Sequence, residues 1–542
     1  MDGLMMDYPL TISKILFRAR QVFSDKEVVS VLPSGQKHRY TYGDLYTRVC
    51  KLINVLRGLG VKPGDRVGTF AWNHHRHLEL YYALPCMGAV LHTLNIRLSA
   101  EQLSYIVNHA EDTHIFVDAS LVKALEPLAK GLPTVRQYIV MTEDGQLPET
   151  TLAPLAEYEA LLAQASSLAD FPDLPEHTAS GLCYTSGTTG NPKGVLYSHR
   201  SIYLHTLMGM TTDCLGISER DVVLPVVPMF HANAWGQPYL AAMTGCKMVF
   251  AGSNLAPDAL VALIQSEHVT YAFGVPTIWN ALLQYLRQKQ PSLGELKRMV
   301  VGGSAVPRAM IVAFKKEFGV DIIQGWGMTE MAPLGSTGRL KRKMEDWSEE
   351  RQFDVLAKAG IIAPAVEMKV VDTAGKEQPW DGKSAGELLV RGPAIVKGYY
   401  RNPEATAAQI TPDGWFRTGD VATLDGDGYV HISDRTKDLI KSGGEWISSV
   451  AMENAIMACA GVLEAAVVAR PDPKWDERPV AFVVRQPGSA KPLAGDVIAH
   501  LSGQFAKWQL PLPEDVRFVE QIPRTSVGKF DKKVLRGQMK SA

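Results

Sequence analysis

The stretch from Tyr184 to Val195 reads Tyr-Thr-Ser-Gly-Thr-Thr-Gly-Asn-Pro-Lys-Gly-Val, with three glycines, four Ser or Thr residues and one lysine. So polar and glycine-rich a segment cannot form core, and we expect a loop whose backbone approaches another group closely. Its N–H groups, its hydroxyls and Lys193 form a donor set that suits a polyphosphate. It differs from the P-loop of kinases and GTPases, because Gly194 follows Lys193 where that loop has Ser or Thr. A flexible surface loop is the alternative, but the apolar residues 179–184 predict a strand directly before this loop, and that strand would fix the direction in which the loop leaves the sheet.

The length and composition indicate a multidomain protein without a nucleic-acid or membrane partner. A chain of 542 residues is too long for a single core, and its net charge of −1 attracts neither nucleic acid nor lipid. The six cysteines lack paired metal-site spacing, which fits reduced thiols. Residues 1–26 have no signal-peptide core, and no run reaches the ~20 apolar residues of a membrane helix. We therefore expect a soluble, cytoplasmic protein.

Hydrophobic periodicity predicts an α/β fold in two domains. Residues 36–125 and 199–318 alternate helical and strand patterns, which predicts parallel sheets covered by helices. Shorter strands at 360–430 predict a β-rich subdomain, and the pattern becomes α+β near 434–437. The predicted division is a large N-terminal domain at 1–434, a hinge at 435–437, and a small mobile α+β C-terminal domain at 438–542.

Three local patterns make narrower predictions. Ser99 followed by Gln102 predicts a capping box at the start of a helix. Residues 494–507 are expected to form one helix in the C-terminal domain. The cluster of His74, His75 and His77 could suggest a metal site, but without an acidic or cysteine partner at ligand spacing a polar helix start is favoured.

A second motif, Phe-His-Ala-Asn-Ala-Trp-Gly at 230–236, follows a buried strand predicted at 221–228. It places the imidazole of His231 and the indole of Trp235 at the carboxyl end of a strand, where open α/β sheets bind ligands. A histidine in ordinary core is the alternative.

Two glycine-containing motifs follow further strands. Val-Val-Gly-Gly-Ser-Ala-Val-Pro at 300–307 allows the backbone to approach a flat ligand closely, although an ordinary tight turn would also fit. Gln-Gly-Trp-Gly-Met-Thr-Glu at 324–330 alternates small and large residues and leaves a slot beside an aromatic face that suits adenine. Glu330 is an oxygen ligand suited to Mg²⁺, which binds one or two carboxylates and substrate phosphates.

Three motifs lie near or beyond the predicted boundary. In Gly-Trp-Phe-Arg-Thr-Gly-Asp at 414–420, the carboxylate of Asp420 can accept hydrogen bonds from both hydroxyls of a ribose. Residues 432–446 cross the boundary, and 523–529 read Pro-Arg-Thr-Ser-Val-Gly-Lys. A lone tail lysine such as Lys529 is ordinarily solvated.

These motifs, in this order, resemble the signatures of the adenylate-forming (ANL) superfamily, which includes acyl-CoA synthetases, nonribosomal adenylation domains and firefly luciferase. The resemblance spans roughly residues 36–535, with Trp326 where Tyr is commoner. It implies a two-step reaction in which a carboxylate attacks the α-phosphorus of ATP, releasing pyrophosphate, and the thiol of coenzyme A then displaces AMP.

The resemblance also implies roles for individual residues. Catalytic roles fall on Lys529, Thr329, Glu330 and His231, and Mg²⁺ is expected on Thr185 and Glu330. The acyl pocket is expected to contain His231, Trp235, Gly302, Gly327 and Met328. Contacts to ATP or AMP are expected from Thr185, Ser186, Gly187, Thr188, Thr189, Gly190, Lys193, Gly303, Ser304, Ala305, Gln324, Gly325, Trp326, Thr329, Asp420, Arg435, Lys437, Lys441 and Trp446. Gly443 and Gly444 are expected beside the pantetheine arm of coenzyme A, after the small domain has rotated at Lys437.

Three alternatives to an acyl-CoA synthetase are open. An amino-acid-activating domain usually carries an Asp where His231 stands, which counts against that class. A luciferase-like oxygenase shares most of the motifs, and oxygen consumption would distinguish it. A non-catalytic nucleotide-binding module would leave Lys529, Glu330 and Asp420 unexplained.

Within the acyl-CoA synthetases, residues 94–98 and 231–236 look most like the fatty-acyl and 3-methylmercaptopropionate ligase branch. Trp235, Trp326 and Met328 should shorten the pocket, so short to medium acids are expected, with thioether acids among them. A longer-chain fatty acid is the alternative, since one methylene gives only ~1–3 kcal/mol of discrimination. The same branch suggests a homodimer.

Overall fold

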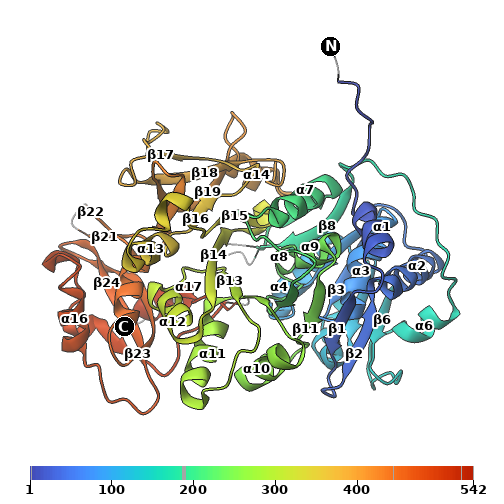
Figure 1. The fold of residues 1–542 in the computed structure, drawn as a ribbon, viewed down its shortest axis with the longest axis horizontal. Coiled ribbons are helices and arrows are strands. Elements are labelled where there is room, and N and C mark those ends of the chain that lie inside the picture. Colours follow the sequence, from blue (N-terminus) through green and yellow to red (C-terminus); the bar gives the residue numbers. More distant parts are fainter. Residues whose placement is uncertain (2, 186–190, 443–444, 526–527, 541–542) are drawn as a thin grey trace.

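The computed structural model describes residues 1, 3–185, 191–442, 445–525 and 528–540. Its large domain is built on two sheets with helices packed around them, and a smaller domain lies at one end (Figure 1). The predicted fold class, α/β with a separate C-terminal domain, is confirmed.

The larger sheet has 13 strands within the described residues. Its strands β1 and β11–β10–β12–β13–β14 run parallel as neighbours, and the central ones are buried on both faces because helices cover each side. The strands from β15 to β20 continue the sheet in antiparallel fashion, so the region predicted as β-rich extends the same sheet. In spatial order the strands are β17 (Glu367–Val371), β18 (Gly386–Arg391), β19 (Phe416–Leu424), β20 (Tyr429–Arg435), β16 (Gly360–Ile362), β15 (Leu334–Thr337), β14 (Asp321–Gly327), β13 (Arg298–Gly302), β12 (Tyr271–Gly274), β10 (Val222–Pro225), β11 (Lys247–Phe250), β1 (Glu27–Val31) and β2 (Lys37–Thr41).

The second sheet positions the glycine-rich loop. The strand predicted at 179–184 is present as β8, and β9 returns antiparallel beside it, so the segment between them leaves the sheet at one edge. In spatial order the strands are β7 (Leu155–Glu157), β6 (Gln137–Met141), β5 (His114–Asp118), β3 (Arg66–Phe70), β4 (Val90–Thr93), β8 (Ala179–Tyr184) and β9 (Gly194–Ser198).

Several helices of the large domain begin at a residue whose side chain caps them. The capping box predicted from Ser99 and Gln102 is confirmed, and Thr41 with Asp44 forms another. These helices are α1 (Ile12–Val22), α2 (Tyr42–Gly58), α3 (His75–Cys86), α4 (Ala100–Ala110), α5 (Val122–Leu125), α6 (Tyr158–Gln164), α7 (His199–Met210), α8 (Ala232–Trp235), α9 (Gln237–Thr244), α10 (Pro257–Ser266), α11 (Pro276–Lys289), α12 (Arg308–Phe318), α13 (Glu349–Leu356) and α14 (Pro403–Gln409).

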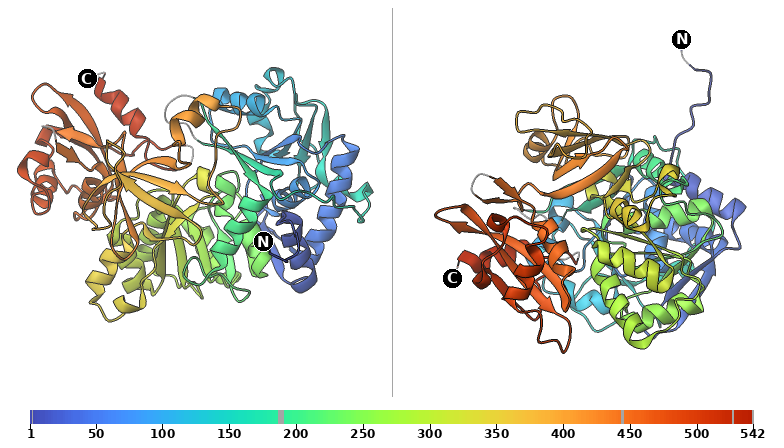
Figure 2. Two further views of the ribbon diagram at one scale, coloured as in Figure 1. Left: turned by 90° about the horizontal axis from the view of Figure 1, so that it is seen from above. Right: turned by 60° about the vertical axis from the view of Figure 1, so that its left-hand side comes forward.

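The C-terminal domain has its own small sheet and its own core. Its strands are β22 (Glu445–Ile447), β21 (Ile440–Ser442), β24 (Asp476–Arg485), β23 (Val462–Asp472) and β25 (Val516–Phe518), and its helices are α15 (Ser449–Met457), α16 (Ala494–Leu501) and α17 (Lys532–Lys540). The domain packs beside α11 of the large domain (Figure 2), where Asn280 Nδ2 donates to the carbonyl of Leu463 at 3.4 Å.

One local prediction is wrong. The helix expected at 494–507 ends at Leu501, just before Gly503, a residue that destabilises helix interiors. The prediction that the histidine cluster begins a helix is confirmed, with His74 as the cap, and the cluster is buried. Its rings are held by neighbours such as Asp118, which lies 2.7 Å from His74.

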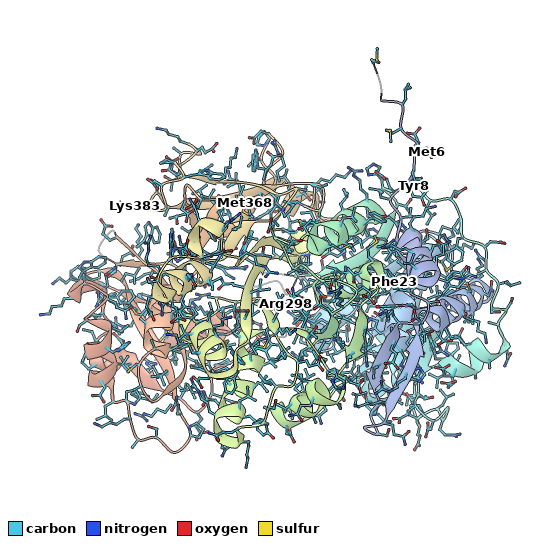
Figure 3. The ribbon with its side chains drawn as sticks, in the orientation of Figure 1. Met6, Tyr8, Phe23, Arg298, Met368 and Lys383 are labelled. Atoms are coloured by element: carbon cyan, nitrogen blue, oxygen red, sulfur yellow. The ribbon has the colours of Figure 1, made fainter. Side chains whose placement is uncertain are left out.

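Two further observations concern the surface. The N-terminal residues extend away from the body of the protein, and Figure 3 shows Met6 and Tyr8 on this extension. No helix of the described residues has both the length and the apolar character needed to span a bilayer.

Candidate active site

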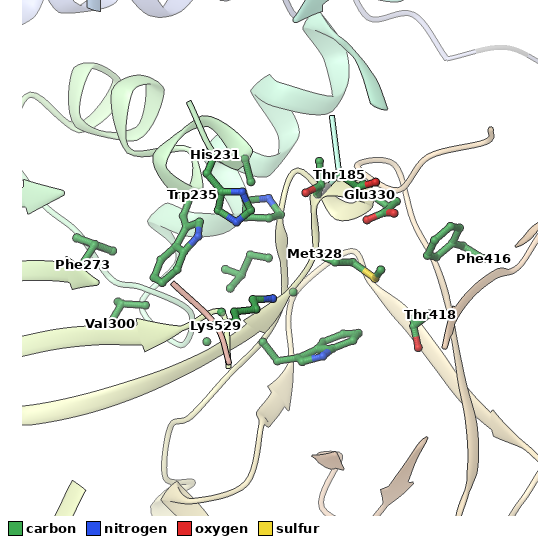
Figure 4. Close-up of a pocket in the computed structure, with 18 of the residues that line it drawn as sticks. Thr185, His231, Trp235, Phe273, Val300, Met328, Glu330, Phe416, Thr418 and Lys529 are labelled. Atoms are coloured by element: carbon green, nitrogen blue, oxygen red, sulfur yellow. The ribbon is translucent and has the colours of Figure 1, made fainter. Parts of the chain in front are cut away.

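A cavity of about 1290 Å³, open solvent at its mouth included, lies where the two domains meet. Strands β12, β13 and β14 contribute residues to its wall, and the C-terminal domain contributes Lys529. Figure 4 shows Lys529 between two groups of side chains, with Trp235, Phe273 and Val300 on one side and Phe416 and Thr418 on the other. The cavity therefore sits at the carboxyl ends of parallel strands, the usual ligand position in such sheets.

One end of the cavity is polar. Glu330 follows β14 in a short 3₁₀ turn and accepts a hydrogen bond from the Tyr399 hydroxyl at 2.8 Å. Burial raises the pKa of this carboxyl, and the Tyr399 hydrogen bond opposes the rise. Thr185 and Lys193 line the same end, with Lys193 Nζ 5.0 Å from the centre of the Tyr399 ring. One carboxylate, one hydroxyl and one ammonium thus line one space, and Thr185 and Lys193 are described residues of the glycine-rich stretch.

A fixed carboxylate lies next to this end. The pairing of β19 with β20 sets Asp420 opposite Arg435, and Arg435 Nε lies 3.0 Å from Asp420 Oδ1. Trp326 Nε1 donates to the other carboxylate oxygen at 2.9 Å. The charge of Asp420 is the main cause that raises the pKa of Arg435. Arg435 and Trp326 line the cavity, with Asp420 directly behind them.

Lys529 reaches the cavity on a turn that ends in a β-bridge between Arg524 and Phe530. Burial, with the nearby charge of Arg435, lowers the pKa of Lys529 to about 8. A Cβ placed on Gly303 would lie 3.9 Å from Lys529 Cε, so the lysine stem passes close to the motif at 300–307.

His231 also lines the cavity. Burial, then the charges of Lys529 and Arg97, lower the pKa of His231 to about 3. The imidazole is therefore neutral at pH 7 and can exchange hydrogen bonds without adding a charge beside Lys529.

The backbone after His231 takes a rare conformation. Ala232, Asn233, Ala234 and Trp235 have φ of 44°, 56°, 47° and 57°, so they form a left-handed turn, which costs about 1–2 kcal/mol per L-residue. The turn lays the Trp235 indole against Gly302 and Gly303 at the end of β13, with its Cη2 3.5 Å from a Cβ placed on Gly302. Such a Cβ would also lie 2.4 Å from the carbonyl oxygen of Gly325, so only glycine fits at 302.

The remaining predicted residues lie in different places. Thr329, Gly303, Gly325, Gly327 and Met328 line the main cavity. Ser304 and Ala305 line a second cavity of about 860 Å³ between the domains. Gln324 is buried, while Lys437, Lys441 and Trp446 do not line either cavity, and Trp446 is 56% exposed on β22. The predictions for Ser186, Gly187, Thr188, Thr189, Gly190, Gly443 and Gly444 concern residues outside those that the structure describes.

Several residues of the site were not predicted, and three of them are polar or charged side chains next to predicted ones. Tyr399 holds Glu330, Arg97 adds charge near His231, and Gln237 lines the cavity. Only Gln237 carries a signal in the sequence, because it is a polar residue in an otherwise apolar stretch that forms a fully buried helix. Elsewhere, the described residues contain no group of three or more His, Cys, Asp or Glu side chains that could hold a metal ion.

Comparison with protein families matches residues 16–400 to the AMP-binding enzymes and residues 451–529 to the AMP-binding enzyme C-terminal domain. The chain is 50% identical to a long-chain-fatty-acid–CoA ligase of Thermus thermophilus over 99% of its length and 97% of the relative. It is 45% identical to a 3-methylmercaptopropionyl-CoA ligase of Ruegeria pomeroyi, and 42% identical to a medium-chain-fatty-acid–CoA ligase of Ectopseudomonas oleovorans. These matches cover 100% and 99% of this chain, and 99% and 97% of the respective relatives.

Among solved structures, ATP-bound MatB from Rhodopseudomonas palustris superposes with a TM-score of 0.82 at 27% identity, covering 98% of this chain and 99% of that one. Apo MatB superposes with a TM-score of 0.74 at the same identity and coverage. The present chain thus superposes more closely on the ATP-bound structure than on the apo structure.

Proposed function

The chain belongs to the AMP-binding enzyme family, and from that membership we propose that it is an ATP-dependent ligase joining a carboxylic acid to coenzyme A through an acyl-adenylate. The observation that carries the proposal is Lys529, which a separate domain inserts into the cavity that His231 lines and beside Gly303. A cation there can contact both an incoming carboxylate and the α-phosphate that it attacks.

In the first step, a carboxylate oxygen of the acid bonds to the α-phosphorus, and the bond to the β-phosphate oxygen breaks so that pyrophosphate leaves. Phosphoryl transfer of this kind depends on positioning and on stabilising negative charge. We assign Lys193 and Thr185 to the leaving phosphates, Asp420 to the ribose and Trp326 to the adenine. Lys529 would hold the two reacting groups together.

We further propose that Mg²⁺ is held by Glu330 and Thr185. One carboxylate and one hydroxyl fit an ion that takes its remaining ligands from phosphates and water. A bound cation would also stabilise the ionised form of Glu330 and so oppose the rise in its pKa that burial causes. The ion would supply charge neutralisation for the phosphates. Titrating Mg²⁺ into metal-free enzyme should restore turnover of the wild type, whereas Glu330→Gln should need a higher concentration without changing which acid is preferred.

In the second step, the thiol of coenzyme A loses its proton, its sulfur bonds to the acyl carbon, and AMP leaves. Lys529 has no role in this step, so we propose that the C-terminal domain then rotates about residues 435–437. This motion would withdraw Lys529 and bring the 441–446 hairpin toward the acyl-adenylate.

For the acid, we propose a short to medium chain, with 3-methylmercaptopropionate among the candidates. Trp235, Phe273 and Val300 narrow one end of the cavity, and the relatives at 45% and 42% identity are named for such acids. A long-chain fatty acid is the second candidate, because the relative at 50% identity is named for it.

The test is a panel of acids from C2 to C16 with ATP and coenzyme A, scored separately for pyrophosphate and for thioester. Release of pyrophosphate and formation of thioester that both require the acid would support the proposal. Thioester formation without ATP, or no product with any acid, would reject it.

We also propose a cytoplasmic homodimer. The N-terminal extension exposes Leu4, Met5 and Met6 almost completely, and burying these side chains against a second copy would remove apolar surface from water. Sedimentation of the full chain would show a monomer if this is wrong.

A further inference from the structure

One buried side chain in the cavity wall has no partner. Gln237 is the first residue of α9 and is 0% exposed, yet neither its Nε2 nor its Oε1 has a hydrogen-bond partner within the described residues. Buried amides are nearly always paired, because an unpaired polar group loses its bonds to water without replacement. The other glutamine of the wall, Gln409, follows that rule and donates to the carbonyl of Arg417 at 3.0 Å.

The backbone conformation fixes Gln237 in this position. The left-handed turn of residues 232–235 continues through Gly236, with φ of 80°, and α9 begins directly after it. All eight residues of α9 are buried, so the helix has no free face toward which the amide could turn to water. A strained backbone conformation of this kind persists only where the surrounding structure holds it in place, and such conformations are common at binding sites.

The surroundings of Gln237 are neutral. His205 lies beside Gly236, and burial lowers the pKa of this histidine to about 4. The Nε2 of His205 accepts a hydrogen bond from the N–H of Leu334, which also fits a neutral ring. The cationic and anionic side chains that line the cavity are Lys193, Glu330, Arg435 and Lys529, the groups assigned above to ATP, Mg²⁺ and the reacting carboxylate. An ammonium or a second carboxylate on the substrate would therefore find no counter-ion beside Gln237.

We propose that Gln237 recognises a hydroxyl group on the chain of the acid, so that the enzyme prefers hydroxy acids to hydrocarbon acids of the same size. A hydroxyl can donate to Oε1 and accept from Nε2, and so pairs both atoms of the amide. A methylene in the same place pairs neither, and a thioether sulfur is only a weak acceptor. The inference rests on the proposed ligase function and names the class of acid for that site.

The test compares acids in which one hydroxyl replaces one methyl group. Suitable pairs are 4-hydroxybutanoate with pentanoate, 5-hydroxypentanoate with hexanoate, and 6-hydroxyhexanoate with heptanoate. With the full-length wild type, kcat/KM for pyrophosphate release should favour the hydroxy acid about tenfold or more for the pair whose hydroxyl reaches Gln237. Replacing pentanoate by 3-methylmercaptopropionate should give a smaller gain.

Two variants separate the amide from the shape of the cavity. Gln237→Met keeps an unbranched side chain of similar length. It should reduce the ratio of kcat/KM for the hydroxy acid to kcat/KM for the hydrocarbon acid to one or below. Leu215→Met changes an apolar residue of the same wall and should keep the preference, even if it changes the absolute rate.

Each outcome decides the inference. If the enzyme turns over hydrocarbon acids as fast as hydroxy acids at every length, the inference is wrong, although the ligase function stands. That result is expected if a water molecule pairs with the amide. A preference that survives in Gln237→Met would overturn the role of this residue. If Gln237→Met does not fold, the same comparison is made with Gln237→Leu, and the wild-type ratios of kcat/KM for hydroxy over hydrocarbon acids test the inference by themselves. Absence of product with every acid would instead reject the proposed function.

Discussion

The surroundings of Lys529 give its charge a pH limit. Because its pKa is lowered to about 8, the side chain is protonated below that pH and becomes neutral above it. If the ammonium is needed for adenylate formation, kcat/KM for pyrophosphate release should fall about tenfold per pH unit above pH 8. Lys529→Arg keeps its charge throughout and should lack this decline, although its maximum rate will be lower.

Removing the charge should separate the two half-reactions. Lys529→Ala should lower adenylate formation by ~10²–10³-fold, as expected for loss of one group that stabilises transition-state charge. Supplied acyl-adenylate should still react with coenzyme A at nearly the normal rate. The control is Lys533→Ala, which alters an exposed lysine in the same region. Equal losses in both half-reactions would contradict the assignment.

Trp235 should set the length of acid that is accepted. Its indole lies against Gly302 and Gly303, so Trp235→Ala removes a wall of the cavity next to Lys529. Short acids should lose kcat/KM by about an order of magnitude through lost apolar contacts, whereas longer acids should lose less or gain. Measuring kcat/KM over a chain-length series together with the melting temperature checks this. Parallel losses for every acid with a lower melting temperature would show that Trp235 is only core.

At the scale of single elements, β13 and β14 approach each other so closely that glycine is required. Gly302→Ala would place its Cβ 2.4 Å from the carbonyl oxygen of Gly325 and should destabilise the protein by about 1–3 kcal/mol. The matched control is Gly325→Ala on the facing strand, where the nearest side-chain atom would be at an ordinary 3.4 Å. Urea denaturation of both variants should show a large loss for the first only, and equal stability of the two would refute the argument.

The elements differ in how far the sequence predicts them. Regular helices and strands followed from periodicity and caps, as at Ser99 and Gln102, because those signals act within a few residues. The left-handed turn at 232–235 did not, since alanine favours right-handed helix and tertiary contacts must override it. One such contact is the Tyr81 hydroxyl, 3.4 Å from Asn233 Oδ1, contributed by a helix far earlier in the chain.

The site was predictable only in part for the same reason. The motifs identify side chains that follow strand ends, and Thr185, His231 and Glu330 do line one cavity. Tyr399 enters the cavity through packing between distant segments, which no local pattern encodes. The proximity of Lys529 to Gly303 depends on how the two domains sit together, a property of the whole molecule.

At the scale of the whole molecule, the arrangement of the domains should permit only the first half-reaction. Lys529 occupies the cavity, and the hairpin of β21 and β22 with Trp446 stands outside it. The proposed rotation can be blocked where the domains touch. A Cβ on Gly528 of the C-terminal domain would lie 3.8 Å from Thr277 Oγ1 of α11, within reach of a disulfide after small adjustments.

The double variant Thr277→Cys/Gly528→Cys should therefore be locked by oxidation. The oxidised enzyme is expected to form acyl-adenylate and release pyrophosphate once, but to transfer the acyl group to coenzyme A at least about tenfold more slowly, because Lys529 stays in place. Reduction should restore the second step. Each single variant should be insensitive to oxidant. The single variants therefore separate the effect of the disulfide from the strain of a side chain at Gly528, where φ is 82°. Thioester formation by the oxidised double variant at the rate of the reduced one would mean that both half-reactions proceed in the arrangement seen here, and the rotation about residues 435–437 would have to be abandoned.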